Sequence, residues 1–136
     1  QAQVLAIIRE RARATGTSVL FISHDMAVVS QLCDRVYVLY AGEVVESGPV
    51  GELLAAPRHP YAQALLRAMP DGHAPKSELA AIPATVPSLI DPPAGCRFRA
   101  RCAFAHDRCA APPPLAEVAP GHRAACWLNL RAESPS

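Results

Sequence analysis

The chain has 136 residues, a formal net charge of +1 and five cysteines. This length corresponds to about one domain, and so small a net charge produces no global field that would attract nucleic acid or an anionic membrane. No apolar run approaches the roughly 18 residues that a membrane-spanning helix needs, and no secretory signal pattern is present. The sequence opens at Gln1 directly in a helical pattern, so we expect a fragment whose N-terminus lies upstream.

The prolines divide the chain into two parts. All 14 of them lie from Pro49 onward. Because proline lacks a backbone donor and interrupts helices, residues 1–48 are predicted to form regular, buried elements and the remainder to form short helices, extended pieces and turns. A small proline-rich unit needs additional cross-links to hold a fold, and four of the five cysteines lie there.

The first elements are predicted from hydrophobic periodicity. Residues 1–14 have the pattern of an amphipathic helix, which Gly16 can end. The apolar run "SVLFIS" at 18–23 is typical of a strand buried on both faces of a parallel sheet. Residues 26–33 predict a second short helix. Its apolar side includes Cys33, which is predicted to pack in the core.

The next elements are shorter. Residues 35–40 and 43–46 predict two strands around a tight Ala-Gly turn. Residues 50–56 and 60–69 predict two short helices, and Pro60 suits the first position of the second one, where a missing N–H is no loss. Helix, strand, helix and strand in this order indicate part of an α/β domain.

His24 and Asp25 come just past the end of the predicted buried strand, which is the edge where open α/β sheets bind ligands. A histidine there can donate a hydrogen bond to an anion or polarise a water molecule. Alternatively, His24 is an ordinary loop residue and Asp25 caps the following helix. The residues alone favour the second interpretation, because a single histidine is weak evidence of a site.

Four cysteines fall within one 31-residue window, with the spacing Cys96-x5-Cys102-x6-Cys109-x16-Cys126. Such a set can bind Zn²⁺ tetrahedrally or hold an iron–sulfur cluster. Zinc sites usually contain cysteine pairs two to four residues apart, and the wider gaps favour a larger object. Disulfides are disfavoured because the chain has the character of a cytosolic protein.

Basic and aromatic residues alternate among these cysteines. The arginines are Arg97, Arg99, Arg101 and Arg108, and the aromatic residues are Phe98 and Phe104. They could form a nucleic-acid surface, or the arginines could offset the negative charge of a four-thiolate site. The small net charge favours the second interpretation, so no nucleic-acid partner is predicted. His106 and His122 are further candidate ligands, although four cysteines already complete a site.

Three stretches in order resemble one protein family. "TSVLFISHDMAVVSQLCDRVYVLYAGEVVESG" resembles the final segment of an ABC-transporter ATPase domain, with its switch-histidine loop. "PVGELLAAPRHPYAQALLRAMP" is similar to the His-Pro-Tyr segment of oligopeptide and dipeptide importer ATPases. "GCRFRARC" and "APGHRAAC" are similar to their C-terminal cysteine extension. The resemblance implies an α/β fold class: the C-terminal piece of a P-loop ABC ATPase domain, followed by a small irregular Pro/Cys-rich extension.

The resemblance also implies a division of the chain into four segments. Residues 1–56 are the C-terminal part of the ATPase core, and 57–94 are the His-Pro-Tyr helix and a proline-rich linker. Residues 95–130 are the four-cysteine metal-binding extension, and 131–136 are a tail. Within the second segment, His59 is interpreted as a structural residue.

The function implied is that of the ATP-hydrolysing subunit of an ABC importer for peptides, with His24 contacting the γ-phosphate of ATP. The full-length protein would use ATP and Mg²⁺, pair with a second ABC ATPase domain, and dock on permease subunits at the cytoplasmic face of the membrane. An extracytoplasmic peptide-binding protein would act indirectly. Because no G-x-x-x-x-G-K-[ST] loop is present, the 136-residue chain alone is predicted to be inactive.

For the cysteine extension, the resemblance implies a 4Fe–4S cluster on Cys96, Cys102, Cys109 and Cys126, with zinc as the alternative. Because many relatives lack these cysteines, the role of the metal is expected to be structural or redox-regulatory. A different hypothesis makes the chain a stand-alone metal-binding interaction module. A weaker one makes it a zinc-binding partner of RNA.

Overall fold

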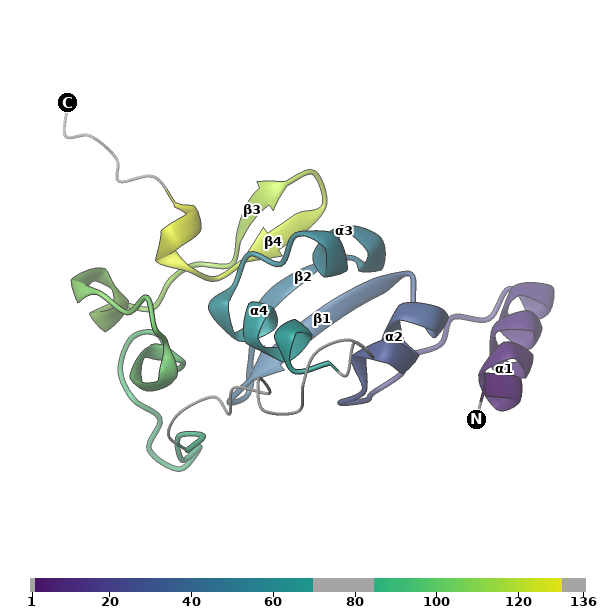
Figure 1. Cartoon of the computed structure of the whole chain (residues 1–136), viewed down its shortest axis with the longest axis horizontal. Helices are drawn as coiled ribbons and strands as arrows, with labels where there is room; N and C mark the ends of the chain where they lie inside the picture. The colour runs from purple at the N-terminus through teal and green to yellow at the C-terminus, as the bar shows by residue number, and fades with distance from the viewer. Residues whose placement is uncertain (1, 70–84, 131–136) are drawn as a thin grey trace.

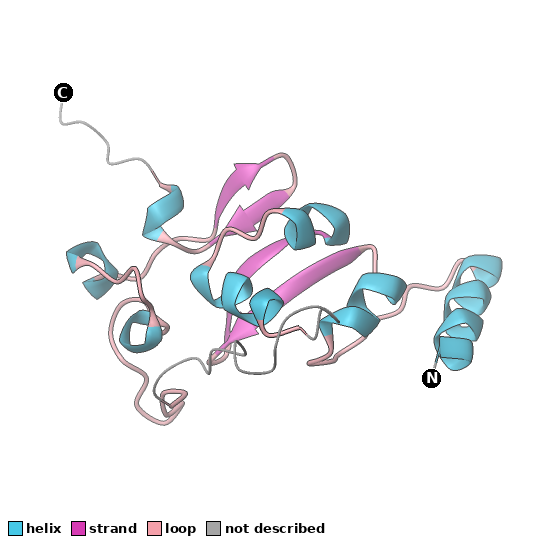
Figure 2. Cartoon of the chain, viewed as in Figure 1, coloured by secondary structure: helices cyan, strands magenta, loops and turns pink. Residues whose placement is uncertain are grey.

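The computed structural model describes residues 2–69 and 85–130, which form a mixed α/β structure (Figures 1 and 2). The helices are α1 (Ala2–Thr15), α2 (Met26–Leu32), α3 (Val50–Ala55) and α4 (Pro60–Arg67). The strands are β1 (Arg35–Tyr40), β2 (Glu43–Pro49), β3 (Ala116–Ala119) and β4 (His122–Ala124). Among the described residues, no helix has both the length and the apolar character that crossing a bilayer requires.

The four strands form one antiparallel sheet in the order β1-β2-β4-β3. The β1–β2 hairpin turns at Ala41 and Gly42, where φ is 48° and 83°. Positive φ at both central residues is the requirement of a type I′ turn, whose twist matches that of the flanking strands. The predicted hairpin with its Ala-Gly turn is therefore confirmed.

The second hairpin corrects the prediction that the cysteine extension is irregular throughout. Its strand β4 pairs with β2 through Glu46↔Ala124 and Ser47↔Arg123, and the backbone N–H of Ala125 donates to the carbonyl of Val45 at 2.8 Å. These strands have only four and three residues, too few for their period to be visible in the sequence. They are ordered by the free edge of β2, which supplies the backbone partners.

The prediction of a strand at residues 18–23 was wrong. Residues 17–23 have no regular secondary structure, and Leu20 and Ile22 are 88% and 89% exposed. An apolar run becomes a buried strand only when neighbouring strands satisfy its backbone groups and helices cover its faces. No parallel strand pairs with this run within the described ranges.

The helices follow the predicted boundaries closely. α1 ends before Gly16, whose φ is 65°. α2 begins after Asp25, whose Oδ1 accepts from the backbone N–H groups of Ala27 at 2.9 Å and Val28 at 3.3 Å. In α4 the first residue is Pro60, as predicted. Part of the predicted proline-rich linker, residues 70–84, lies outside the described residues.

A single core joins these elements. Its buried members come from α2, the first hairpin, α3, α4 and the cysteine segment: Val29, Val36, Val38, Tyr40, Val45, Leu53, Ala62 and Phe98. Cys33 is half-buried and packs against this core, which agrees with the role predicted for it. Since Phe98 lies between Cys96 and Cys102 in sequence, the cysteine segment is anchored on the same core as the hairpin.

Candidate functional site: a four-cysteine pocket on the histidine-capped helix

The two predicted sites lie in different parts of the molecule (Figure 1). His24 is exposed in the loop that leads into α2, and within the described residues its side chain has no hydrogen bond or ion pair. The cysteine segment lies at the other end of the sheet from that loop. The candidate site that the structure builds from several elements is therefore the cysteine site.

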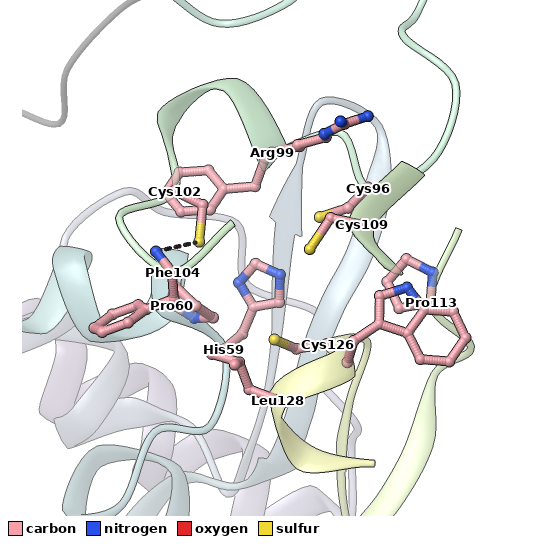
Figure 3. Close-up of a pocket in the computed structure, with 12 residues that line it drawn as sticks. His59, Pro60, Cys96, Arg99, Cys102, Phe104, Cys109, Pro113, Cys126 and Leu128 are labelled. Atoms are coloured by element: carbon pink, nitrogen blue, oxygen red, sulfur yellow. Dashed lines mark hydrogen bonds between the residues drawn. The ribbon is translucent and has the colours of Figure 1, made fainter. Parts of the chain in front are cut away.

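The four clustered cysteines line one pocket (Figure 3). Cys96 precedes the 3-10 helix η2 (Arg99–Arg101), and Cys102 follows it. Cys109 lies within η3 (Asp107–Ala110), and Cys126 is the N-cap residue of η4 (Trp127–Asn129). Three short turns thus bring together thiols that are up to 30 positions apart in the sequence.

Gly95 allows the first and third cysteines to approach. The backbone N–H of Cys96 donates to the carbonyl of Cys109 at 3.0 Å. Gly95 has φ of 80°, and a Cβ added there would lie 2.4 Å from that carbonyl oxygen. A residue with a side chain would therefore be strained in its backbone and would also collide with the Cys109 turn.

Phe98 fixes the first two cysteines to the core. Its ring lies edge-on to Tyr40, with centroids 5.1 Å apart, and contacts Tyr61 at 5.6 Å and His59 at 5.8 Å. Edge-to-face and tilted arrangements are the favourable geometries for aromatic pairs. The Cys96–Cys102 loop is thus attached to β1 and α4 by an aromatic cluster.

The thiols of Cys96, Cys102 and Cys126 share one electrostatic environment. Burial raises the pKa of each, and the pKa of each is raised further by neighbouring members of the same four-cysteine set. Backbone N–H groups act in the opposite direction, from Phe98 on Cys96, from Phe104 on Cys102 and from Leu128 on Cys126. Thiols in such a site release protons when a positive ion binds.

The pocket is not arranged around one point. Within the described residues, no three His, Cys, Asp or Glu side chains are placed to hold a single metal ion. The enclosed space is about 10 Å³, which is close to the space that one water molecule occupies. The sulfurs therefore surround a closed pocket without converging on its centre.

The arginines do not gather around the pocket as the sequence suggested. Arg97 forms an ion pair with Glu43 at 3.2 Å, Arg101 donates to the Tyr40 hydroxyl at 3.1 Å, and Arg108 stacks 4.3 Å above the Trp127 ring. Only Arg99 is among the residues that line the pocket. Two of the four guanidinium groups, those of Arg97 and Arg101, thus attach the segment to the first hairpin, whereas Arg108 stacks on a residue of the segment itself.

His59 is the residue of this site that the sequence did not reveal. It is 1% exposed, lines the pocket with the cysteines, and lies between their sulfurs in Figure 3. Its Nδ1 accepts from the backbone N–H of Tyr61 at 3.0 Å, which caps α4. Burial lowers the pKa of His59 from 6.5 to about 4, so the ring is neutral near pH 7. The structural role predicted for His59 is confirmed.

A buried carboxylate holds His59 from the other side. Glu46 of β2 is fully buried and accepts from the backbone N–H groups of Arg58 and His59, each at 2.8 Å. Because an ionised carboxylate can only accept, the third partner, His122 Nε2 at 2.6 Å, is a donor. His122 therefore pairs with Glu46 and does not line the cysteine pocket.

Comparison with known proteins places this architecture. Residues 45–109 match the family model described as "Oligopeptide/dipeptide transporter, C-terminal region". The chain is 52% identical over 128 residues to the "Probable D,D-dipeptide transport ATP-binding protein DdpD" of Escherichia coli (strain K12), covering 93% of this chain and 39% of that protein. It is 47% identical over 131 residues to the "Probable peptide ABC transporter ATP-binding protein y4tR" of Sinorhizobium fredii, covering 95% and 39%.

The chain is therefore part of the ATP-binding protein of an ABC transporter. More particularly, it belongs to the oligopeptide/dipeptide transport family, in which it corresponds to the C-terminal region. It spans 39% of the length of each of these two relatives.

Proposed function

We propose that this chain is the C-terminal part of a subunit that hydrolyses ATP to drive peptide uptake through an ABC importer. The observation that carries the proposal is the identity of 52% and 47% with two such transport proteins over more than nine-tenths of the chain. Peptides of the dipeptide and oligopeptide classes are the proposed cargo. The proposed partners are a second ATPase domain and membrane permeases at the cytoplasmic face, with an extracytoplasmic peptide-binding protein acting indirectly.

In this function, His24 is the residue proposed to act on the nucleotide. Its exposed position before the N-cap of α2 leaves the ring accessible to the γ-phosphate of ATP bound by the remainder of the protein. An imidazole N–H placed there would offset the charge that develops on the transferring phosphoryl group. Asp25 holds the start of α2 through its two cap bonds and thereby orients the loop.

The test compares variants of the full-length protein that contains this chain. His24→Ala is expected to lower ATP turnover at least about a hundredfold, as loss of a transition-state donor typically does, without weakening Mg-ATP binding to the same extent. The matched control is His106→Ala, since His106 is also exposed but lies in the cysteine segment. Equal turnover by the His24 variant and the control would refute the assignment. The 136-residue chain alone is expected to show no turnover.

We further propose that the four-cysteine pocket holds an inorganic group, a 4Fe–4S cluster in preference to zinc. The support is the donor set: four cysteines line one pocket, and backbone N–H groups face three of the sulfurs. N–H donors to sulfur are the outer-shell contacts that stabilise thiolate-bound metal centres.

Loading would require movement, because the closed pocket has room for about 10 Å³. The test is purification without oxygen, followed by assays of iron, sulfide and zinc and a visible spectrum. Broad absorption with stoichiometric iron and sulfide is expected for the cluster, and one zinc per colourless chain would exclude it.

A second function remains a candidate on one observation. The described residues pack as one core, which a stand-alone metal-binding interaction module would also need. The coding sequence upstream of Gln1 distinguishes the two functions: a phosphate-binding loop there supports the transporter ATPase, and its absence supports the module.

A further inference from the structure

The closed form of the cysteine pocket does not fit an inorganic group. Its enclosed space is about 10 Å³, and no three His, Cys, Asp or Glu side chains of the described residues are placed to hold a metal ion. All four cysteines that line the pocket are free thiols. The chemistry open to the thiols in this closed form is therefore reaction with one another.

Cys96 and Cys109 are joined through their backbones. The N–H of Cys96 donates to the carbonyl of Cys109 at 3.0 Å. A backbone hydrogen bond of this kind keeps the two Cα atoms roughly 5–6 Å apart, and a disulfide needs Cα atoms that are about 4.4–6.8 Å apart. The backbones of these two residues therefore meet the requirement of a disulfide while the turns that carry them stay in place.

The side chains of the same two residues point to one place. Figure 3 shows the sulfur atoms of Cys96 and Cys109 next to each other, whereas Cys102 lies on the far side of the His59 ring. The proximity of the two thiols also affects ionisation: burial raises the pKa of the Cys96 thiol, and the Cys109 sulfur raises it further. Backbone and side chains thus select the same pair.

We propose that Cys96 and Cys109 form a reversible disulfide when the metal-free chain is exposed to hydrogen peroxide. Cys96 is half-buried and Cys109 is buried, so the peroxide reaches Cys96 first. The Cys96 sulfur bonds to one peroxide oxygen and becomes a sulfenic acid, while the other oxygen leaves as water with the thiol proton. The Cys109 sulfur then attacks the sulfenic sulfur. The S–S bond forms, the S–O bond breaks, and the hydroxyl leaves as water with the Cys109 proton.

Such a disulfide would make the site sensitive to oxidation. In reducing compartments, the disulfides that do form are usually transient and serve catalysis or redox sensing. The link would remove two of the four thiols from the ligand set, so the oxidised chain would take up no iron or zinc until a reductant restores them. This consequence rests on the proposed function of the pocket, whereas the disulfide itself does not.

An unfolded chain would favour a different pairing. Cys102 lies between Cys96 and Cys109 in the sequence, and shorter loops close at a lower entropic cost. Without the fold, the Cys96–Cys102 and Cys102–Cys109 disulfides would therefore form more readily than the proposed one. The pairing that is found thus distinguishes an effect of the structure from an effect of the sequence spacing.

The experiment oxidises the reduced, chelator-treated 136-residue chain with one equivalent of hydrogen peroxide. Disulfides are then mapped by mass spectrometry after tryptic digestion without reductant, since Lys and Arg residues place each cysteine on a separate peptide. We expect the loss of two thiols per chain, and a Cys96–Cys109 link at least about tenfold more abundant than any other pair. The same oxidation in urea is expected to remove that preference.

The matched control is Cys102→Ser, because Cys102 lines the same pocket but is not part of the pair. This variant should form the Cys96–Cys109 link as the parent chain does, whereas Cys96→Ser should form no disulfide within the chain at the same peroxide dose. The mapping in the parent chain needs no variant, so a variant that does not fold leaves the test intact.

The outcomes are distinct. A dominant link through Cys102, a link between two chains, or five thiols retained after oxidation would each overturn the proposal. Metal uptake is measured separately on the reduced and the oxidised chain. If the reduced chain takes up neither iron nor zinc, the proposed metal function is wrong, and the disulfide is judged by the mapping alone.

Discussion

Replacing Glu46 by glutamine tests the buried carboxylate that joins β2, α4 and β4. The substitution preserves shape and removes the charge. Glu46 accepts three hydrogen bonds, from two backbone N–H groups and from His122 Nε2. Because an amide has one oxygen and one NH₂ group, at least one of these donors must face another donor in the variant.

The expected loss of stability follows from this count. Losing a hydrogen bond to a charged, buried acceptor accounts for about 1.5–3 kcal/mol, and leaving a buried donor unpaired adds about 1–3 kcal/mol. We therefore expect Glu46→Gln to lower the free energy of unfolding by about 3 kcal/mol. A domain of this size has only about 5–15 kcal/mol in total, so the unfolding midpoint should shift clearly.

The assay is urea unfolding of the 136-residue chain at pH 7, followed by far-ultraviolet circular dichroism. The matched control is Glu43→Gln, on the same strand. Glu43 has a half-exposed side chain and a single ion pair with Arg97, and such pairs contribute about 1 kcal/mol or less. A loss below about 1 kcal/mol for Glu46→Gln, or one no larger than the control shows, would refute the reasoning.

Three further predictions concern the cysteine pocket. Phe98→Ala should lower the free energy of unfolding by about 3–5 kcal/mol, because its ring is buried against Tyr40 and Tyr61. The same urea assay measures this loss, and Phe104→Ala, at a half-exposed site, is the control. Gly95→Ala should abolish metal uptake, measured by iron and zinc analysis, because the added Cβ would collide with the Cys109 carbonyl. Normal metal uptake by this variant would contradict the close approach of Gly95 and Cys109. Acid should destabilise the metal-free chain between pH 6.5 and about 4, because the unfolded state takes up a proton on His59 while the folded state keeps it neutral, with a pKa of about 4. The free energy of unfolding should fall by about 3 kcal/mol over this range. An equal fall in the His59→Asn variant would contradict the prediction.

Short-range features of this fold could be predicted from the sequence. The turn at Ala41 and Gly42, the cap by Asp25 and the start of α4 at Pro60 each depend on a few neighbouring residues. The strand predicted at 18–23 failed for the opposite reason. A β-branched apolar run specifies a strand only if a neighbouring strand is available to pair with it, and Leu20 is exposed instead.

The four cysteines of the candidate site could be identified from the sequence, but the residues that surround them could not. His59 could not be placed in the pocket, because an isolated histidine has no periodic pattern that shows which way its ring faces. The pairing of Glu46 with His122 joins residues 76 positions apart, and no local signal indicates such a contact. The arginines were misplaced because charge complementarity was considered without the competing partners Glu43, Tyr40 and Trp127.

The pairing of β4 with β2 has a consequence for the solubility of the chain. With β1 on one side, β2 would otherwise present an open row of backbone N–H and C=O groups on its other side. Such edges are templates for association with other chains. β4 covers part of that row. Proteolysis between residues 85 and 115, followed by loss of the C-terminal hairpin, would therefore expose the edge of β2 to pairing with other chains. The extension thus covers a strand edge of the sheet, whatever its cysteines bind.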